Sequence, residues 1–296
     1  MNRWWNAAAL VLVAPGLVQA HSGEPLQLHD LVKAWEFDPG VVIPLFISAL
    51  LFARGARRSR GVSTRRIACF WAGWAALVFA LVSPLHPLGE ALFSAHMIQH
   101  EVLILISAPL LVISHPLVPF LWGMPMEFRR TAGRWAKAVW VERGWRRLTD
   151  PFTAWWIHAV VLWAWHAPPM FQATLTSNWA HAAQHLSFLL SALLFWWALF
   201  FAHGKLGYGS SVLYVFTTMV YTGILGALLT FVPKLWYPAY APRTAAWGLS
   251  PLQDQQIGGL VMWVPAGLVY MGVGLALFAQ WLRESEAVVA RRWYAQ

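Results

Sequence analysis

The chain has 296 residues, of which 59% are hydrophobic and only 11% are charged, and its mean hydropathy is +0.52. This composition is typical of a membrane protein and excludes a soluble domain, which must cover its core with polar and charged residues. The formal net charge of +9 does not indicate nucleic-acid binding, because the basic residues lie in connections between apolar segments, where membrane topology requires them.

The first 20 residues are typical of a signal peptide, with Arg3 before an apolar run and the small-residue sequence Val18-Gln19-Ala20 at the cleavage position. Cleavage there would give His21 a free amine beside its imidazole, a strong copper-chelating unit. His29 follows in the same external segment, residues 21–38. The alternative is a retained signal anchor with two ordinary solvent-exposed histidines.

Seven apolar stretches follow, and each is long enough to be interpreted as a membrane-spanning helix. They predict an all-α, polytopic membrane protein, a seven-helix bundle over residues 39–282 with a tail at 283–296. The predicted spans are 39–54, 67–84, 96–114, 152–168, 181–202, 210–232 and 257–282.

Positive charge predicts the orientation of this bundle, because short cytoplasmic loops collect Arg and Lys. The first and third connections and the tail are basic, whereas the opposite connections carry few cations. We therefore expect a cytoplasmic C-terminus and an external N-terminus. The deciding residues are Arg54, Arg57, Arg58, Arg60, Arg65 and Arg66 in the first connection and Arg129, Arg130, Arg134, Lys137, Arg143, Arg146 and Arg147 in the third.

Two segments at the outer end of the bundle share the pattern H-x-x-Q-H, namely His96 to His100 and His181 to His185. In a helix, residues four apart lie on one face about 6 Å apart along the axis, so each pair offers two imidazoles to one point. Imidazoles within a membrane are costly unless they have partners, which favours a functional role. The pattern predicts a metal site.

His86 and His166 are expected at the same level as these pairs. A single histidine in a bundle more often makes an interhelical hydrogen bond than binds a metal, but six on one level favour a metal site. Such a site requires that the helices be neighbours. The histidines expected elsewhere are His115, His158 and His203.

Copper is the metal that these donors favour, because imidazole suits copper, zinc and iron, and copper(II) leads the divalent series. The single cysteine, Cys69, excludes a paired-thiolate site. Thioethers would favour copper(I). Met97 lies on a different helix face from the histidines and is interpreted as a packing residue, whereas Met170 is either an accessory ligand or a loop residue.

Four polar residues are accessory candidates. Gln99 and Gln184 are expected to pack or to hydrogen-bond to ligands rather than to bind the ion. Glu101, inside the apolar run, is expected to orient an imidazole or to hold a proton. Asp254 begins the seventh predicted helix and has a capping role available in its first turn.

Four separated motifs, in order, resemble the CtaG family of cytochrome c oxidase assembly factors. The resemblance covers about residues 40–282 and implies a multi-pass protein of the bacterial inner (cytoplasmic) membrane that supports copper delivery to the catalytic subunit of a haem-copper oxidase. It carries over to His96, His100, His166, His181, His185 and Asp254, while His115 departs from the family pattern. The motifs are His96-Met97-Ile98-Gln99-His100 leading to Ala108-Pro109-Leu110-Leu111, Trp163-Ala164-Trp165-His166-Ala167-Pro168, His181 to His185 with Phe195-Trp196-Trp197, and Asp254-Gln255-Gln256-Ile257-Gly258-Gly259-Leu260-Val261-Met262-Trp263.

The expected function is therefore copper binding at the outer mouth of the bundle and transfer of the ion to the oxidase subunit in the bilayer. The ion would come from a periplasmic copper chaperone or from His21 and His29. No residue is expected to make or break bonds in an organic substrate, so the chain is not expected to be an enzyme. Three alternatives remain, namely a haem-binding electron-transfer protein, a copper importer or resistance protein, and a structural scaffold without metal.

Overall fold

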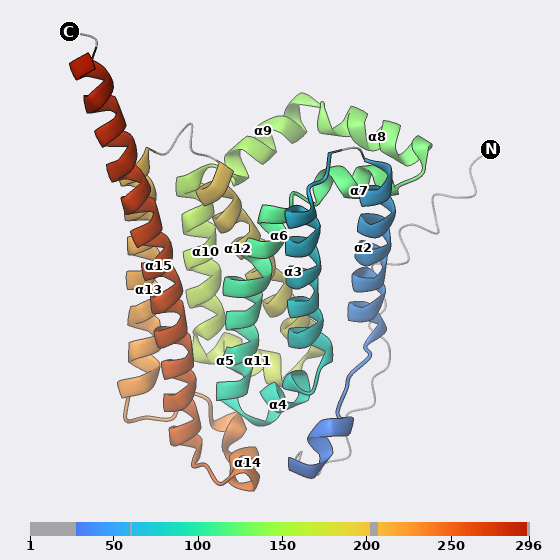
Figure 1. The fold of residues 1–296 in the computed structure, drawn as a ribbon. Coiled ribbons are helices and arrows are strands. Elements are labelled where there is room, and N and C mark those ends of the chain that lie inside the picture. Colours follow the sequence, from blue (N-terminus) through green and yellow to red (C-terminus); the bar gives the residue numbers. More distant parts are fainter. Residues whose placement is uncertain (1–27, 60, 202–206, 295–296) are drawn as a thin grey trace.

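The computed structural model describes residues 28–59, 61–201 and 207–294, and within these ranges every regular element is helical (Figure 1). The predicted signal peptide, His21 and His203 lie outside the described residues. His29 belongs to the short helix η2 (Leu28–Lys33). The structure describes the backbone of His29 but not its side chain.

Six helices are long and apolar enough to cross a membrane. A shorter helix, α10 (Pro151–His166), runs beside them and packs against two of them (Figure 1). Each of the seven predicted stretches falls on one of these helices, although α2 and α15 extend beyond their predicted ends at 54 and 282. The six are α2 (Pro39–Arg58), α3 (Thr64–Val82), the continuous helix Phe93–Ser114, α12 (Asn178–Phe201), α13 (Tyr208–Phe231) and α15 (Pro251–Tyr294).

The helix Phe93–Ser114 changes its hydrogen-bonding register in the middle. It begins as α5 (Phe93–Glu101), continues as a π-helical segment, η3 (Val102–Ser107), and ends as α6 (Ala108–Ser114). Pro109 has no N–H group for an α-helical bond, which favours a local change of register. The carbonyl of Ile104, inside the π segment, instead accepts a hydrogen bond of 2.8 Å from the Trp196 indole.

Short helices that the sequence analysis treated as loops cover both ends of the bundle. The helices α4 (Leu85–Ala91), α11 (Pro168–Thr176), η4 (Pro238–Tyr240), α14 (Ala241–Thr244) and η5 (Ala245–Trp247) connect the long helices at one end. The opposite end carries α7 (Leu117–Gly123), α8 (Met126–Ala136) and α9 (Val139–Leu148) (Figure 1). The strongly basic third connection is thus largely helical, with no buried residue in α8 or α9.

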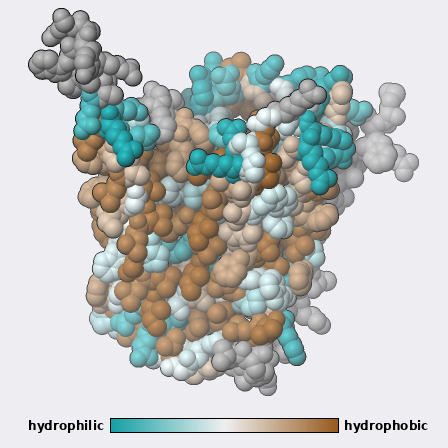
Figure 2. Space-filling model, viewed as in Figure 1, coloured by the Kyte–Doolittle hydropathy of each residue, from teal (hydrophilic) through white to brown (hydrophobic). Residues whose placement is uncertain are grey.

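Close helix contacts at small residues hold α13 and α15 together. A Cβ atom on Gly259 would lie only 2.8 Å from the Gly226 carbonyl oxygen and 2.7 Å from the Thr230 amide nitrogen. Only glycine permits this approach of the two backbones. Hydrophobic side chains cover the lateral surface of the bundle, and hydrophilic ones gather mainly at the end that carries α8 and α9 (Figure 2).

Candidate metal centre

The two H-x-x-Q-H segments face each other across the bundle. The His96 ring on α5 lies 5.1 Å from the His181 ring and 5.4 Å from the His185 ring on α12, measured between centroids. The His100 ring lies 5.4 Å from that of His185. The helices that carry the two segments are therefore neighbours, which is the condition that the predicted metal site required.

The two other histidines predicted at this level join the same cluster from different elements. The His86 ring, on α4, stacks on His181 with centroids 5.1 Å apart and an interplanar angle of 11°. The His166 ring, at the end of α10, lies 5.8 Å from that of His100. His86 was expected to end the second spanning helix, but α3 stops at Val82 and His86 belongs to the separate helix α4.

The hydrogen bonds around the cluster leave lone pairs on its imidazoles. The His96 Nε2 atom donates to Gln184 Oε1 at 3.0 Å, so its Nδ1 atom holds a lone pair. The His166 Nδ1 atom donates to the Leu162 carbonyl at 2.7 Å, so its Nε2 atom holds one too. Buried imidazole nitrogens without a hydrogen-bond partner among the described residues are His96 Nδ1, both nitrogens of His100, and the Nε2 atoms of His166, His181 and His185.

This arrangement fits a metal ion. A buried polar atom without a partner costs about 1–3 kcal/mol, and several in one place call for a shared partner. One nitrogen from each of His96, His100 and His185 lies within 4.8 Å of the other two, and the same holds for His86, His181 and His185. Ligands about 2.0 Å from a tetrahedral metal are about 3.3 Å apart, so binding needs these nitrogens to move together by at most about 1.5 Å.

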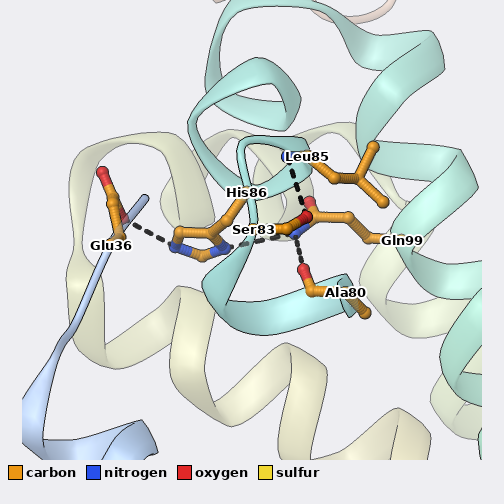
Figure 3. Close-up of polar contacts among 6 residues, drawn as sticks. All are labelled: Glu36, Ala80, Ser83, Leu85, His86 and Gln99. Atoms are coloured by element: carbon orange, nitrogen blue, oxygen red, sulfur yellow. Dashed lines mark hydrogen bonds and ion pairs between the residues drawn. The ribbon is translucent and has the colours of Figure 1, made fainter. Parts of the chain in front are cut away.

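The two glutamines of the paired motifs hydrogen-bond to histidines. Gln184 accepts from His96, as stated, and the Gln99 side-chain amide donates to His86 Nδ1 at 3.1 Å and to the Ala80 carbonyl at 2.8 Å (Figure 3). Each glutamine thus contacts a histidine outside its own segment. Such contacts fix the tautomer and the orientation of an imidazole.

Asp254 was predicted to cap the helix that it begins, but its side chain hydrogen-bonds to a different helix. Its carboxylate accepts hydrogen bonds from the Phe93 amide at 2.6 Å, the Ser94 amide at 3.1 Å and the Ser94 hydroxyl at 2.5 Å. It therefore caps the N-terminus of α5, the helix of His96 and His100, rather than the first turn of α15. Asp254 is fully buried and positions the histidine-bearing helix.

The remaining candidates differ in exposure and in the residues that they contact. Met170 is 45% exposed on α11, and Met97 packs against α15, where a Cβ on Gly258 would lie 3.3 Å from its Cγ. The Oε2 atom of Glu101 is buried without a hydrogen-bond partner in the described part of the chain, so this oxygen does not orient an imidazole. The Nδ1 atom of His158 pairs with the Ser191 hydroxyl at 3.2 Å.

Glu36 was not predicted as a site residue, yet its Oε2 atom lies 3.4 Å from His86 Nε2. The Glu36 amide donates to the Val82 carbonyl at 3.0 Å, which ties the segment before α2 to the end of α3. An acidic residue just before the first span, on the side of the histidines, was the available signal.

Comparison with known proteins identifies relatives of this chain by sequence. Residues 49–284 match the family model described as cytochrome c oxidase caa3 assembly factor. Uncharacterized proteins of Mycobacterium bovis and Mycobacterium tuberculosis are 28% identical over 279 residues, and one of Mycobacterium leprae is 25% identical. The match covers 90% of this chain but only 42% of each relative. No solved structure matches significantly.

Proposed function

Because the chain belongs to the cytochrome c oxidase caa3 assembly factor family, we propose that it binds copper at the imidazole cluster and supports insertion of the ion into the catalytic subunit of a haem-copper oxidase. Copper is the cargo in this proposal. The proposed ligands are His86, His96, His100, His166, His181 and His185, with His21, His29 and Met170 as accessory donors.

The unpartnered imidazole nitrogens are the observation that carries this proposal. They come from α5, α10 and α12, and they converge at one end of the bundle among buried side chains. A set of neutral imidazoles suits copper and zinc, and the oxidase catalytic centre to which the family relates needs copper. Imidazole ligands can also be lost one at a time, which a transfer requires.

The distribution of charge favours the external side for this cluster. The basic helices α8 and α9 lie at the opposite end of the bundle, with the end of α2 that carries Arg57 and Arg58 (Figure 1). By the rule that cytoplasmic connections are basic, the histidines lie on the periplasmic side of the inner membrane. This topology includes α10 as a seventh span, and places the C-terminal tail in the cytoplasm.

Transfer then needs no bond-making chemistry on an organic substrate. A periplasmic copper chaperone or the N-terminal segment loads the cluster, and the ion leaves to an oxidase subunit docked beside the bundle in the bilayer. The protein acts by binding and releasing the ion, so we do not assign it an enzymatic reaction.

The competing functions receive less support from the contacts. A haem needs an open slot between two facing imidazoles, whereas here the rings of His96 on α5 and His185 on α12, which face each other, pack with centroids 5.4 Å apart. A copper importer needs exchangeable donors through the bundle. The deep hydroxyls of Thr218 and Thr222 instead donate to the Tyr214 and Thr218 carbonyls of their own helix.

Oxidase assembly in cells tests this function. A strain that lacks the gene is complemented with the wild type, with a His96→Ala/His185→Ala double variant, or with His115→Asn, which removes a histidine at the other end of the bundle. We expect the double variant to leave oxidase activity and oxidase copper at the level of the deletion strain, while His115→Asn restores both. Full oxidase copper with the double variant would contradict the proposal.

A further inference from the structure

The exposure of the clustered histidines decreases stepwise into the bundle. The His86 side chain is 19% exposed, His181 and His185 are 8% and 7% exposed, and His96 and His100 are 0% and 1% exposed. The His181 ring lies between those of His86 and His96, with centroids 5.1 Å from each. The imidazoles thus form a column from the surface to the core.

Two groups of ligand atoms follow each other along this column. The outer group is His86, His181 and His185, and the inner group is His96, His100 and His185. Because His185 belongs to both, an ion at one position competes with an ion at the other for the same imidazole. A shared ligand of this kind allows an ion to pass between positions without full release.

The two groups differ in the hydrogen bonds that their histidines must break in order to bind an ion. His86 already has contacts on both ring nitrogens, since Nδ1 accepts from Gln99 and Nε2 faces Glu36 (Figure 3). It must give up one of these contacts to bind an ion, and the contact to Glu36, at 3.4 Å, is the longer one. The nitrogens of His100, in contrast, meet the hydrogen-bond criteria with no partner among the described residues. The inner position is therefore expected to bind more tightly.

We propose that the cluster contains two overlapping metal positions, a weaker outer one that receives copper and a tighter inner one that retains it. The outer position uses His86, His181 and His185, and the inner one uses His96, His100 and His185. Glu36 is a positioning residue that holds His86 over the entrance. This inference rests on the proposed function, in that it takes copper to be the ion bound.

Copper(II) ion alone, added to the purified full-length protein in detergent, tests the two positions. Affinity is measured against a competing chelator, and the loading rate is measured by stopped flow. His86→Asn should keep the wild-type affinity within about threefold but load about tenfold more slowly. His100→Asn should lose about a hundredfold in affinity or more and keep fast, weak binding, since loss even of a residue that only supports a ligand costs about 10–100-fold.

Two further variants control this experiment. His158→Asn removes a buried histidine outside the cluster and should change neither affinity nor rate. Glu36→Gln should slow loading less than His86→Asn does and leave the final affinity unchanged. The unfolding temperature of each variant is measured in parallel, and His86→Gln and His100→Gln replace any Asn variant that does not fold.

The outcomes separate this inference from the function on which it rests. Equal losses of affinity in the His86 and His100 variants, with unchanged loading rates, would show one undivided site and overturn the two positions. Absence of copper binding to the wild type would instead overturn the proposed function.

Discussion

The His96 Nε2 atom donates a hydrogen bond of 3.0 Å to Gln184 Oε1 and so joins the two H-x-x-Q-H segments directly. Both residues are fully buried, so water does not compete for this bond. The bond fixes the His96 ring and leaves its Nδ1 lone pair for an ion. The second glutamine of the paired motifs thereby acts on the first pair of histidines.

Loss of this bond should weaken copper binding without abolishing it. Gln184→Leu is expected to lower copper affinity about 10–100-fold while the stoichiometry at saturation stays unchanged, because the ring becomes free to turn. Gln172→Leu, a part-buried glutamine on α11 that contacts the Pro168 carbonyl, is the control and should leave affinity unchanged. Wild-type affinity in Gln184→Leu would show that the bond has no role in binding.

Asp254 should stabilise the protein through α5. Asp254→Ala removes the acceptor of three hydrogen bonds and leaves the Phe93 and Ser94 amides unpaired in the core, so the free energy of unfolding should fall by about 1–3 kcal/mol. Asp254→Asn retains one acceptor oxygen and should cost less. Thermal unfolding in detergent measures both, and an unchanged midpoint in Asp254→Ala would contradict the capping role.

The close approach of α13 and α15 should require glycine at position 259 but not at position 272. Gly259→Ala brings a methyl group within 3 Å of the Thr230 backbone and is expected to destabilise the bundle by about 1–3 kcal/mol. Gly272→Ala, on the same helix with nothing within 4 Å of the added Cβ, should be neutral or slightly stabilising. Equal unfolding temperatures for the two variants would argue against this packing.

The packing of the rings predicts the absorption spectrum of the purified protein. Because the imidazoles contact one another and leave no slot for a porphyrin, the protein as isolated should show no Soret band, and added haemin should not produce the spectrum of a bis-histidine haem. A stoichiometric Soret band that disappears in a His100→Ala variant would favour the haem alternative.

The sequence predicted the fold class and most of the cluster because both depend on simple periodicities. Apolar length located the six helices that are long enough to cross a membrane and the shorter α10, and the four-residue spacing put His96 and His100 on one face. The ends of the helices were less predictable. Formation of the short helices α4 and α11 depends on their packing against the histidine cluster. Hydropathy along the sequence does not predict such tertiary contacts.

Contacts between distant segments were beyond prediction from one sequence. Asp254 has an ordinary local role at the start of its own helix, so its bond to Phe93 could not be anticipated without the packing of α15 on α5. Glu36 lay in a polar segment without a motif, and its place just before the first span was the one signal. The partners of Gln99 and Gln184 likewise depend on adjacency of helices rather than on spacing within one.

The copper stoichiometry of the purified protein tests the central claim most directly. Wild-type protein is compared with a variant in which His96, His100, His181 and His185 are all replaced by Ala, and with His115→Asn. His115, whose pKa is lowered by partial burial and by nearby Arg66, is a suitable control because Asn tolerates its left-handed backbone, with φ at 51°. We expect at least one tightly held copper per chain in the wild type and in His115→Asn, and none in the four-histidine variant. Equal copper in all three proteins would contradict the account.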